Sequence, residues 1–211
     1  MKFPNKNAKK ERVIVYVDGF NLYFGMVEAG FGYCKWLDLN ELTRNLLRPH
    51  QQLIGIKYFT SRVSNNPQKQ KRQTTYIEAL ESTGIEVIYG QYQSNCIRCN
   101  RCGNRWNTFN EKMTDVNIAT YLLVDAYKDG YDTAMLISGD SDLVPPMKAV
   151  HQNFPHKRVF VAFPPKRKNV SVSSIAKGHL IIGRKKLVDS QFPDEVQKAD
   201  GFTLKKPSRW S

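Results

Sequence analysis

Short apolar runs alternate with amphipathic stretches along the chain, in the order typical of strands and helices. The β-branched run at 13–17 predicts a buried strand that ends at the turn-forming pair Asp18-Gly19. Further strands are predicted at 54–60, 85–92, 131–138 and 157–163. Helices are predicted over 38–47, 67–82, 111–128, 143–152 and 172–180. Strands that alternate with helices predict an α/β domain with a mostly parallel sheet of about five strands, covered on both faces.

Aspartates follow two of these predicted strands directly. Ligand sites in parallel sheets lie outside the carboxyl ends of the strands. Asp18 ends the first strand, and Asp140 and Asp142 follow the fourth. If those two strands are neighbours, the three carboxylates meet at one edge of the sheet, and Asp115, early in the 111–128 helix, could reach the same edge.

The segment Ser138-Gly-Asp-Ser-Asp142 has two interpretations. Two carboxylates that are two residues apart at a strand end suit a hard cation, which prefers oxygen ligands. The same residues can instead form a turn and cap the next helix. Asp18 at a second strand tip favours the cation site, because clustered carboxylates repel one another unless a cation neutralises them.

Charge is sorted along the chain, whose formal net charge is +13. Residues 156–211 hold thirteen basic and four acidic groups, whereas residues 110–142 hold two basic and seven acidic groups. An acidic focus in a basic chain suits a protein that holds cations at one spot and phosphates around it, although basic tails that only solvate the surface give the same totals. The chain has neither the roughly 20-residue apolar stretch of a membrane span nor the apolar core of a signal peptide. A cytoplasmic protein without a membrane partner is therefore expected.

Three cysteines, Cys96, Cys99 and Cys102, lie within seven residues of a predicted polar loop at 94–109. Thiolates at this spacing suit a structural Zn²⁺, but a tetrahedral site needs a fourth ligand. Cys34, a histidine, or a second chain in a homodimer could supply it. The alternative is a loop of reduced cysteines without metal.

Arginines and one tryptophan in the same loop suggest contact with RNA. Arginine pairs with phosphate, and an aromatic ring stacks on an unpaired base. For Trp106, anchoring of the loop is an equally good explanation. For Lys112, a solvated position on the surface is the commoner role of a lysine. The residues predicted to contact RNA are Arg72, Arg98, Arg101, Arg105, Trp106 and Lys112.

Three segments, taken in order, resemble the signature segments of NYN domains in the PIN-like nuclease superfamily, with the greatest similarity to the bacterial LabA-like branch. They are Val13-Ile-Val-Tyr-Val-Asp-Gly-Phe-Asn-Leu-Tyr23, Glu111-Lys-Met-Thr-Asp-Val-Asn-Ile-Ala119 and Ile137-Ser-Gly-Asp-Ser-Asp-Leu143. The resemblance runs from about residue 12 to 188 and implies a PIN-like three-layer α/β/α sandwich. It also implies a Mg²⁺- or Mn²⁺-dependent ribonuclease whose acidic site comprises Asp18, Asp115, Asp140 and Asp142, with Asn21 nearby. Of these, Asp18 and Asp140 are the first choice for direct ligands; Asn21 could hold a water or a phosphate oxygen, or cap a helix.

The predicted organisation is a basic N-terminal tail at 1–11, the nuclease domain at 12–188 with its cysteine-containing loop, and a polar basic C-terminal tail at 189–211. The predicted function is metal-dependent hydrolysis of RNA phosphodiester bonds. One alternative is a non-catalytic RNA-binding or regulatory domain with the same fold, and another is a different phosphate enzyme. The chain lacks a P-loop, which argues against a nucleotide-driven motor or kinase.

Overall fold

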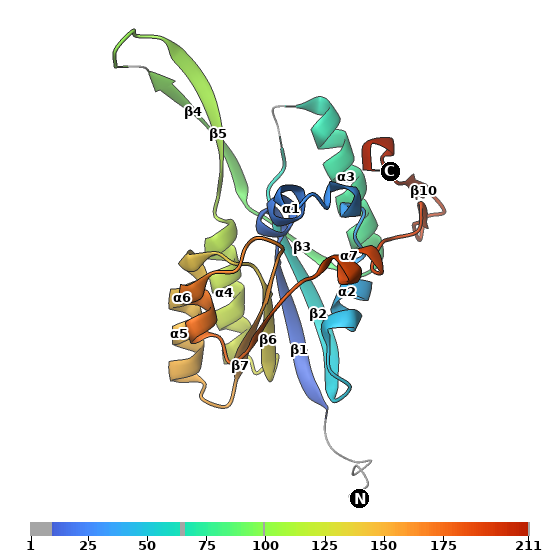
Figure 1. Cartoon of the computed structure of the whole chain (residues 1–211), viewed down its shortest axis with the longest axis vertical. Helices are drawn as coiled ribbons and strands as arrows, with labels where there is room; N and C mark the ends of the chain where they lie inside the picture. The colour runs from blue at the N-terminus through green and yellow to red at the C-terminus, as the bar shows by residue number, and fades with distance from the viewer. Residues whose placement is uncertain (1–9, 64–65, 99, 211) are drawn as a thin grey trace, which may run out of the picture.

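The computed structural model describes residues 10–63, 66–98 and 100–210; for 92–97 and 106–111 it describes only the backbone. Its centre is one parallel sheet with the strand order β3-β2-β1-β6-β7-β8 (Figure 1). The six strands are β1 (Glu11–Asp18), β2 (Gln51–Thr60), β3 (Glu86–Tyr89), β6 (Thr133–Ile137), β7 (Arg158–Phe163) and β8 (His179–Ile181). The predicted α/β class with a parallel sheet is confirmed.

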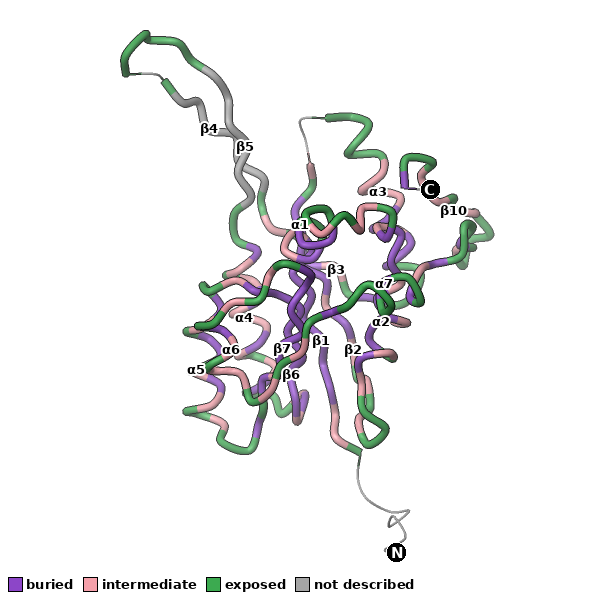
Figure 2. Tube along the Cα trace, viewed as in Figure 1, coloured by how far each residue is buried: buried purple, intermediate pink, exposed green. Residues whose placement is uncertain are grey.

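Both faces of the sheet are covered, because the side chains of β1 alternate between two hydrophobic clusters. Val13, Val15 and Val17 belong to one cluster, and Ile14 and Tyr16 belong to the other. The first cluster includes residues of α1 (Gly19–Glu28), α2 (Leu39–Leu46), α3 (Pro67–Ser82) and α7 (Arg184–Val188). The second includes residues of α4 (Thr114–Tyr127), α5 (Val144–Asn153) and α6 (Val170–Ile175). The result is the three-layer α/β/α sandwich, with buried strands at its centre (Figure 2).

The strand order reverses at β1: the chain first adds β2 and β3 on one side of β1, and then adds β6, β7 and β8 on the other side. On one side β1 pairs with β2, and on the other it pairs with β6, where Val17 lies opposite Ile137. The first and fourth predicted strands are thus neighbours, as the convergence of the aspartates requires. A reversal of this kind leaves a crevice at the carboxyl ends of the two strands, which is where parallel sheets bind ligands.

One predicted helix is wrong in its second half. Asn169 caps α6 through bonds from the backbone N–H groups of Ser171 and Val172, but the helix ends at Ile175. The chain then extends, and β8 pairs with β7 as a sixth strand. An edge strand of three residues is too short to show a periodic signal in the sequence.

The predicted cysteine loop is also wrong in form, because it is a β-hairpin. β4 (Gln91–Arg98) and β5 (Arg105–Lys112) pair in antiparallel register and project from the body as an arm (Figure 1). The two strands satisfy each other's backbone hydrogen bonds, so the arm forms without the apolar pattern that marks the core strands.

Residues 189–211, expected to form a tail, are folded up to Trp210. β9 (Glu195–Gln197) and β10 (Thr203–Lys205) form a small hairpin, followed by the 3₁₀ helix η3 (Ser208–Trp210). Four apolar side chains of this segment join the core beside α3: Phe192, Val196, Leu204 and Trp210. Trp36 fixes the segment further by donating its Nε1–H to the Pro193 carbonyl at 2.7 Å. At the other end, residues 1–9 of the predicted N-terminal tail lie outside the described residues.

Within the described part of the chain, every helix is too short or too polar to cross a membrane.

Candidate functional site

Asp18 lies at the tip of β1 and is only 4% exposed. Its Oδ1 accepts a hydrogen bond from the backbone N–H of Asn21 at 3.0 Å, which caps α1, and its Oδ2 accepts one from the Ser138 hydroxyl at 2.9 Å. Burial raises the pKa of Asp18, against the effect of these bonds, and the neighbouring Asp140 carboxylate raises it further. A nearby cation would stabilise the charged form of this carboxylate.

Asp140 and Asp142 lie in the loop that leaves β6. The Asp140 N–H donates to Ser138 Oγ at 3.1 Å, and Asp140 Oδ1 accepts from the Asp142 N–H at 3.0 Å, which caps the 3₁₀ helix η2 (Ser141–Leu143). The turn-and-cap interpretation is therefore confirmed for Asp140, which caps η2, whereas α5 begins at Val144 without a side-chain cap. It does not compete with cation binding, because one hydrogen bond uses one of about four lone-pair sites on a carboxylate.

Asn21 joins the two loops that carry these aspartates. Its Oδ1 accepts the Gly139 N–H at 3.0 Å. The alternative prediction that Asn21 caps a helix is wrong, because Asp18 occupies that position. Gly139 is also tightly packed: a Cβ added there would lie 1.8 Å from the Arg167 carbonyl oxygen. The loop thus approaches the β7–α6 connection too closely for any side chain at this position.

Asp115 comes from a third element, the first turn of α4. The residue before this helix, Met113, has a left-handed backbone with φ of 78°, a conformation that costs energy for a side chain of this size and tends to occur at functional sites. Burial, together with the charges of Asp18, Asp140 and Asp142, raises the pKa of Asp115 to about 6. The structure thus brings the other three predicted aspartates within electrostatic reach of Asp115.

No ion pair found among the described residues involves any of these four aspartates. Nor do any three acidic, histidine or cysteine side chains in that part of the chain stand close enough to form a ready-made set of metal ligands. The donors are all carboxylate oxygens, whose repulsion a cation would relieve. They suit Mg²⁺ or Mn²⁺ held by one or two carboxylates, with the others reached through water.

The basic residues predicted to contact RNA fall into two places. Arg98, Arg101 and Arg105 are exposed at or beside the tip of the arm, and Lys112 is exposed at its base. Arg72 lies instead on α3, where it lines a pocket. The side chain of Trp106, for which base stacking was predicted, lies outside the described residues.

The predicted zinc site is described only in part. Cys102 is a free, exposed cysteine near the tip of the arm, whereas Cys99 and the side chain of Cys96 lie outside the described residues. Cys34 is 1% exposed within the hydrophobic core. It therefore lies in the body and not in the arm, which removes one of the three sources proposed for the fourth ligand.

The four aspartates Asp18, Asp115, Asp140 and Asp142 form an acidic centre. Sequence reasoning missed a pocket near this acidic centre, with a volume of about 370 Å³ and a lining that begins at Gly19, directly after Asp18. Its lining includes Tyr23, Tyr58, Lys35, Lys69 and Arg209, together with Arg72 and Trp210. These residues come from separate segments of the chain, so no single motif contains them. The only local signal is the aromatic run Phe20, Tyr23 and Phe24 that directly follows Asp18 and Gly19.

Known proteins resemble this chain in fold or in sequence. The crystal structure of VPA0982, a protein of unknown function from Vibrio parahaemolyticus RIMD 2210633, matches with a TM-score of 0.61 at 22% identity, covering 89% of this chain and 100% of that one. A relative named 6-hydroxy-3-succinoylpyridine 3-monooxygenase HspA, from Pseudomonas putida (strain DSM 28022 / S16), is 26% identical over 199 residues. That match covers 77% of this chain and 62% of HspA, so the chain spans less than two thirds of its relative's length.

The model of the NYN domain matches residues 12–182, which include all four aspartates of the acidic centre. The match also covers the six-stranded sheet except for what lies before residue 12. This chain therefore belongs to the NYN domain family, a family of the nuclease-type PIN-like superfamily.

Proposed function

We propose that this chain is a metal-dependent ribonuclease of the LabA-like branch, which hydrolyses RNA phosphodiester bonds in the cytoplasm. The observation that carries the proposal is the acidic centre at the reversal point of the sheet. Four carboxylates from three elements lie near one another there, and the charges of the other three help to raise the pKa of Asp115 to about 6. A protein keeps such an arrangement when a bound cation offsets its cost.

A divalent ion bound at this centre would lower the pKa of a water molecule and screen the charge of the scissile phosphate. Asp18 and Asp140, at the tips of adjacent strands, would supply direct oxygen ligands. Asp115 and Asp142 would hold water molecules by accepting their hydrogen bonds. Asn21 uses its Oδ1 to bind the Gly139 N–H, which points its amide group into the junction of the two loops and leaves Nδ2 to donate to water or phosphate.

The arm would hold the RNA strand beside this centre. Arg98, Arg101 and Arg105 are exposed, and their planar guanidinium groups bind phosphate through paired hydrogen bonds. Lys112, at the base of the arm, precedes Asp115 by only three residues. Contacts of this kind position a strand without reading its sequence.

The test is cleavage of a labelled single-stranded RNA with Mn²⁺ or Mg²⁺, against the same reaction in EDTA. We expect cleavage only with metal. Asp18→Asn should abolish it, since the amide preserves the cap on α1 but weakens a hard-cation ligand. The matched control is Asp194→Asn, which neutralises a carboxylate that is 88% exposed in the C-terminal segment. A parent protein that never cuts RNA with either metal would contradict the proposal, and retained RNA binding would then favour the non-catalytic alternative.

A further inference from the structure

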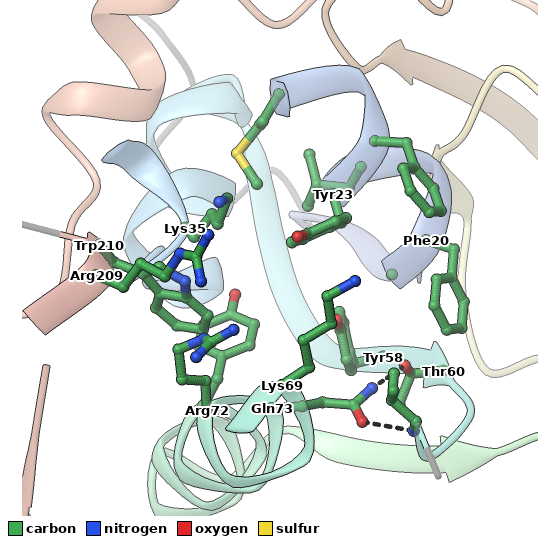
Figure 3. A pocket seen from close by; sticks show the side chains of 16 residues that line it. Phe20, Tyr23, Lys35, Tyr58, Thr60, Lys69, Arg72, Gln73, Arg209 and Trp210 are labelled. Atoms are coloured by element: carbon green, nitrogen blue, oxygen red, sulfur yellow. Dashed lines mark hydrogen bonds between the residues drawn. The ribbon is translucent and has the colours of Figure 1, made fainter. Parts of the chain in front are cut away.

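The pocket of about 370 Å³ lies between α1, α3 and the C-terminal η3 (Figure 3). Its lining includes Gly19 but none of the four aspartates of the acidic centre. Gly19 directly follows Asp18, and a Cβ added at Gly19 would lie 2.6 Å from the Tyr58 ring, so Tyr58 packs against the backbone at that point. The charge of Asp18 also contributes to the raised pKa of the buried Tyr58 hydroxyl. A molecule in the pocket would therefore lie near the end of β1 that carries Asp18, where the metal site is proposed.

Four cationic side chains line the pocket: Lys35, Lys69, Arg72 and Arg209. Among the ion pairs of the described residues, none involves these four. Burial lowers the pKa of Lys35, and the charges of Arg209 and Arg72 lower it further. Figure 3 shows Lys35, Arg72 and Arg209 gathered at one side of the pocket. Cations that repel one another in a partly enclosed space form a site for an anion with more than one negative charge.

Aromatic rings also line the pocket. Trp210 is 7% exposed and is fixed against Tyr76 and Trp36, with ring centroids 6.0 and 6.4 Å away. Tyr23 is 38% exposed, and the Lys35 ammonium lies 5.4 Å from the centroid of its ring. An exposed ring beside a cation can stack on a flat heterocycle whose phosphate the cation binds.

The wall formed by α3 is held in place before any ligand enters. Gln73 Oε1 accepts the Val63 N–H at 2.9 Å, and Gln73 Nε2 donates to the Ser61 carbonyl at 2.9 Å. These bonds tie the helix that carries Lys69 and Arg72 to the end of β2. A preformed wall lowers the entropy cost of binding.

We propose that this pocket binds one unpaired nucleotide of the RNA strand next to the bond that is cut, with the base on Tyr23 and the flanking phosphates on Lys35, Arg72 and Arg209. The assignment of RNA rests on the proposed function. The volume lies within the usual range for small-ligand pockets. A small aromatic carboxylate shares the combination of ring and anion, but one carboxylate leaves most of the four cations unneutralised, whereas a nucleotide in a strand is flanked by two phosphates.

The test measures binding in EDTA, where no metal-dependent cleavage occurs. Titration calorimetry with AMP, UMP and a 5′-phosphorylated tetranucleotide compares the parent with Arg72→Ala/Arg209→Ala. We expect the double variant to bind at least tenfold more weakly. Tyr23→Leu should weaken binding about five- to a hundredfold, the range for loss of one base stack. Lys148→Ala, which removes an exposed cation on α5 across the sheet, is the matched control and should bind like the parent.

Failure of this inference can be told apart from failure of the ribonuclease proposal. If RNA is never cut but these nucleotides bind and the pocket variants weaken that binding, the pocket stands and the nuclease assignment falls. If RNA is cut but no probe binds at millimolar concentration, or the pocket variants bind like the Lys148→Ala control, the pocket assignment is overturned. Tighter binding of nicotinate than of any nucleotide would also overturn it, in favour of a small aromatic acid. Circular dichroism of each variant checks that a loss of binding is not a loss of fold.

Discussion

Proton competition at Asp115 should control how tightly the acidic centre binds its metal. With a pKa of about 6, this carboxyl is about 90% protonated at pH 5 and about 10% protonated at pH 7 in the metal-free protein. The proton must leave before the carboxylate can face a cation. The apparent affinity for Mn²⁺ should therefore be roughly tenfold weaker at pH 5 than at pH 7.

Asp115→Asn removes this titration. The variant should bind Mn²⁺ more weakly than the parent at pH 7 and should lose most of the tenfold step between pH 7 and pH 5. Titration calorimetry at pH 5, 6 and 7 measures both effects, and repeating the titration in buffers of different ionisation enthalpy counts the protons released. Asp194→Asn should keep the parent's pH dependence. An equally steep pH dependence in parent and Asp115→Asn would refute the assignment of this proton to Asp115.

The raised pKa of Asp115 also makes the free energy of unfolding of the metal-free protein depend on pH, in a direction that can be worked out. The pKa of Asp115 rises from a model value of 3.8 to about 6 on folding. The folded state thus binds more protons than the unfolded state between about pH 4 and pH 6, and the free energy of unfolding falls as pH rises through that window. Urea unfolding in EDTA should show Asp115→Asn gaining stability over the parent at pH 7 relative to pH 5. An identical difference at both pH values would contradict this reasoning.

Three further predictions concern the loop, the arm and its cysteines. Gly139→Ala should cost about 1–3 kcal/mol in unfolding free energy, because its Cβ would meet the Arg167 carbonyl, and should also lower metal-dependent cleavage; a thermal melt like the parent's would contradict this. Replacing Arg98, Arg101 and Arg105 together by alanine should reduce the slope of log affinity against log salt by about 2 for single-stranded RNA, and an unchanged slope would place the strand elsewhere. If the arm holds zinc, protein purified without chelator should carry about one zinc per chain or per dimer, and metal analysis that finds none would remove that idea.

The sequence predicts the core of the fold because the core strands are buried on both faces. The apolar runs that form β1 and β6 are recognisable in the sequence as buried strands. Asp18 and Asp140 lie at or just after the ends of these runs, so their positions could be predicted as well. That β1 and β6 are neighbours depends on the order of strands in the whole sheet, and local sequence patterns do not determine this order. The packing of Gly139 and the bond from its N–H to Asn21 also depend on that adjacency.

The elements that prediction missed are those that do not depend on a periodic apolar face. The arm is stabilised by pairing between its own two strands, and its residues are largely polar. The C-terminal segment joins the core through single apolar residues, such as Phe192 and Trp210, separated by polar stretches that resemble a solvated tail. The pocket follows from the second effect, since Arg209 and Trp210 of η3 complete its lining.

The central claim is that the aspartates form a catalytic metal centre, and Asp140→Asn tests it most directly. The substitution keeps the shape and volume of the side chain, and its Oδ1 can still accept the Asp142 N–H that caps η2. Cleavage of labelled RNA at matched Mn²⁺ concentration should fall on the order of a hundredfold or more, while folding and metal-free RNA binding persist. A variant that cuts RNA as fast as the parent would show that Asp140 only caps the helix and that the catalytic centre lies elsewhere.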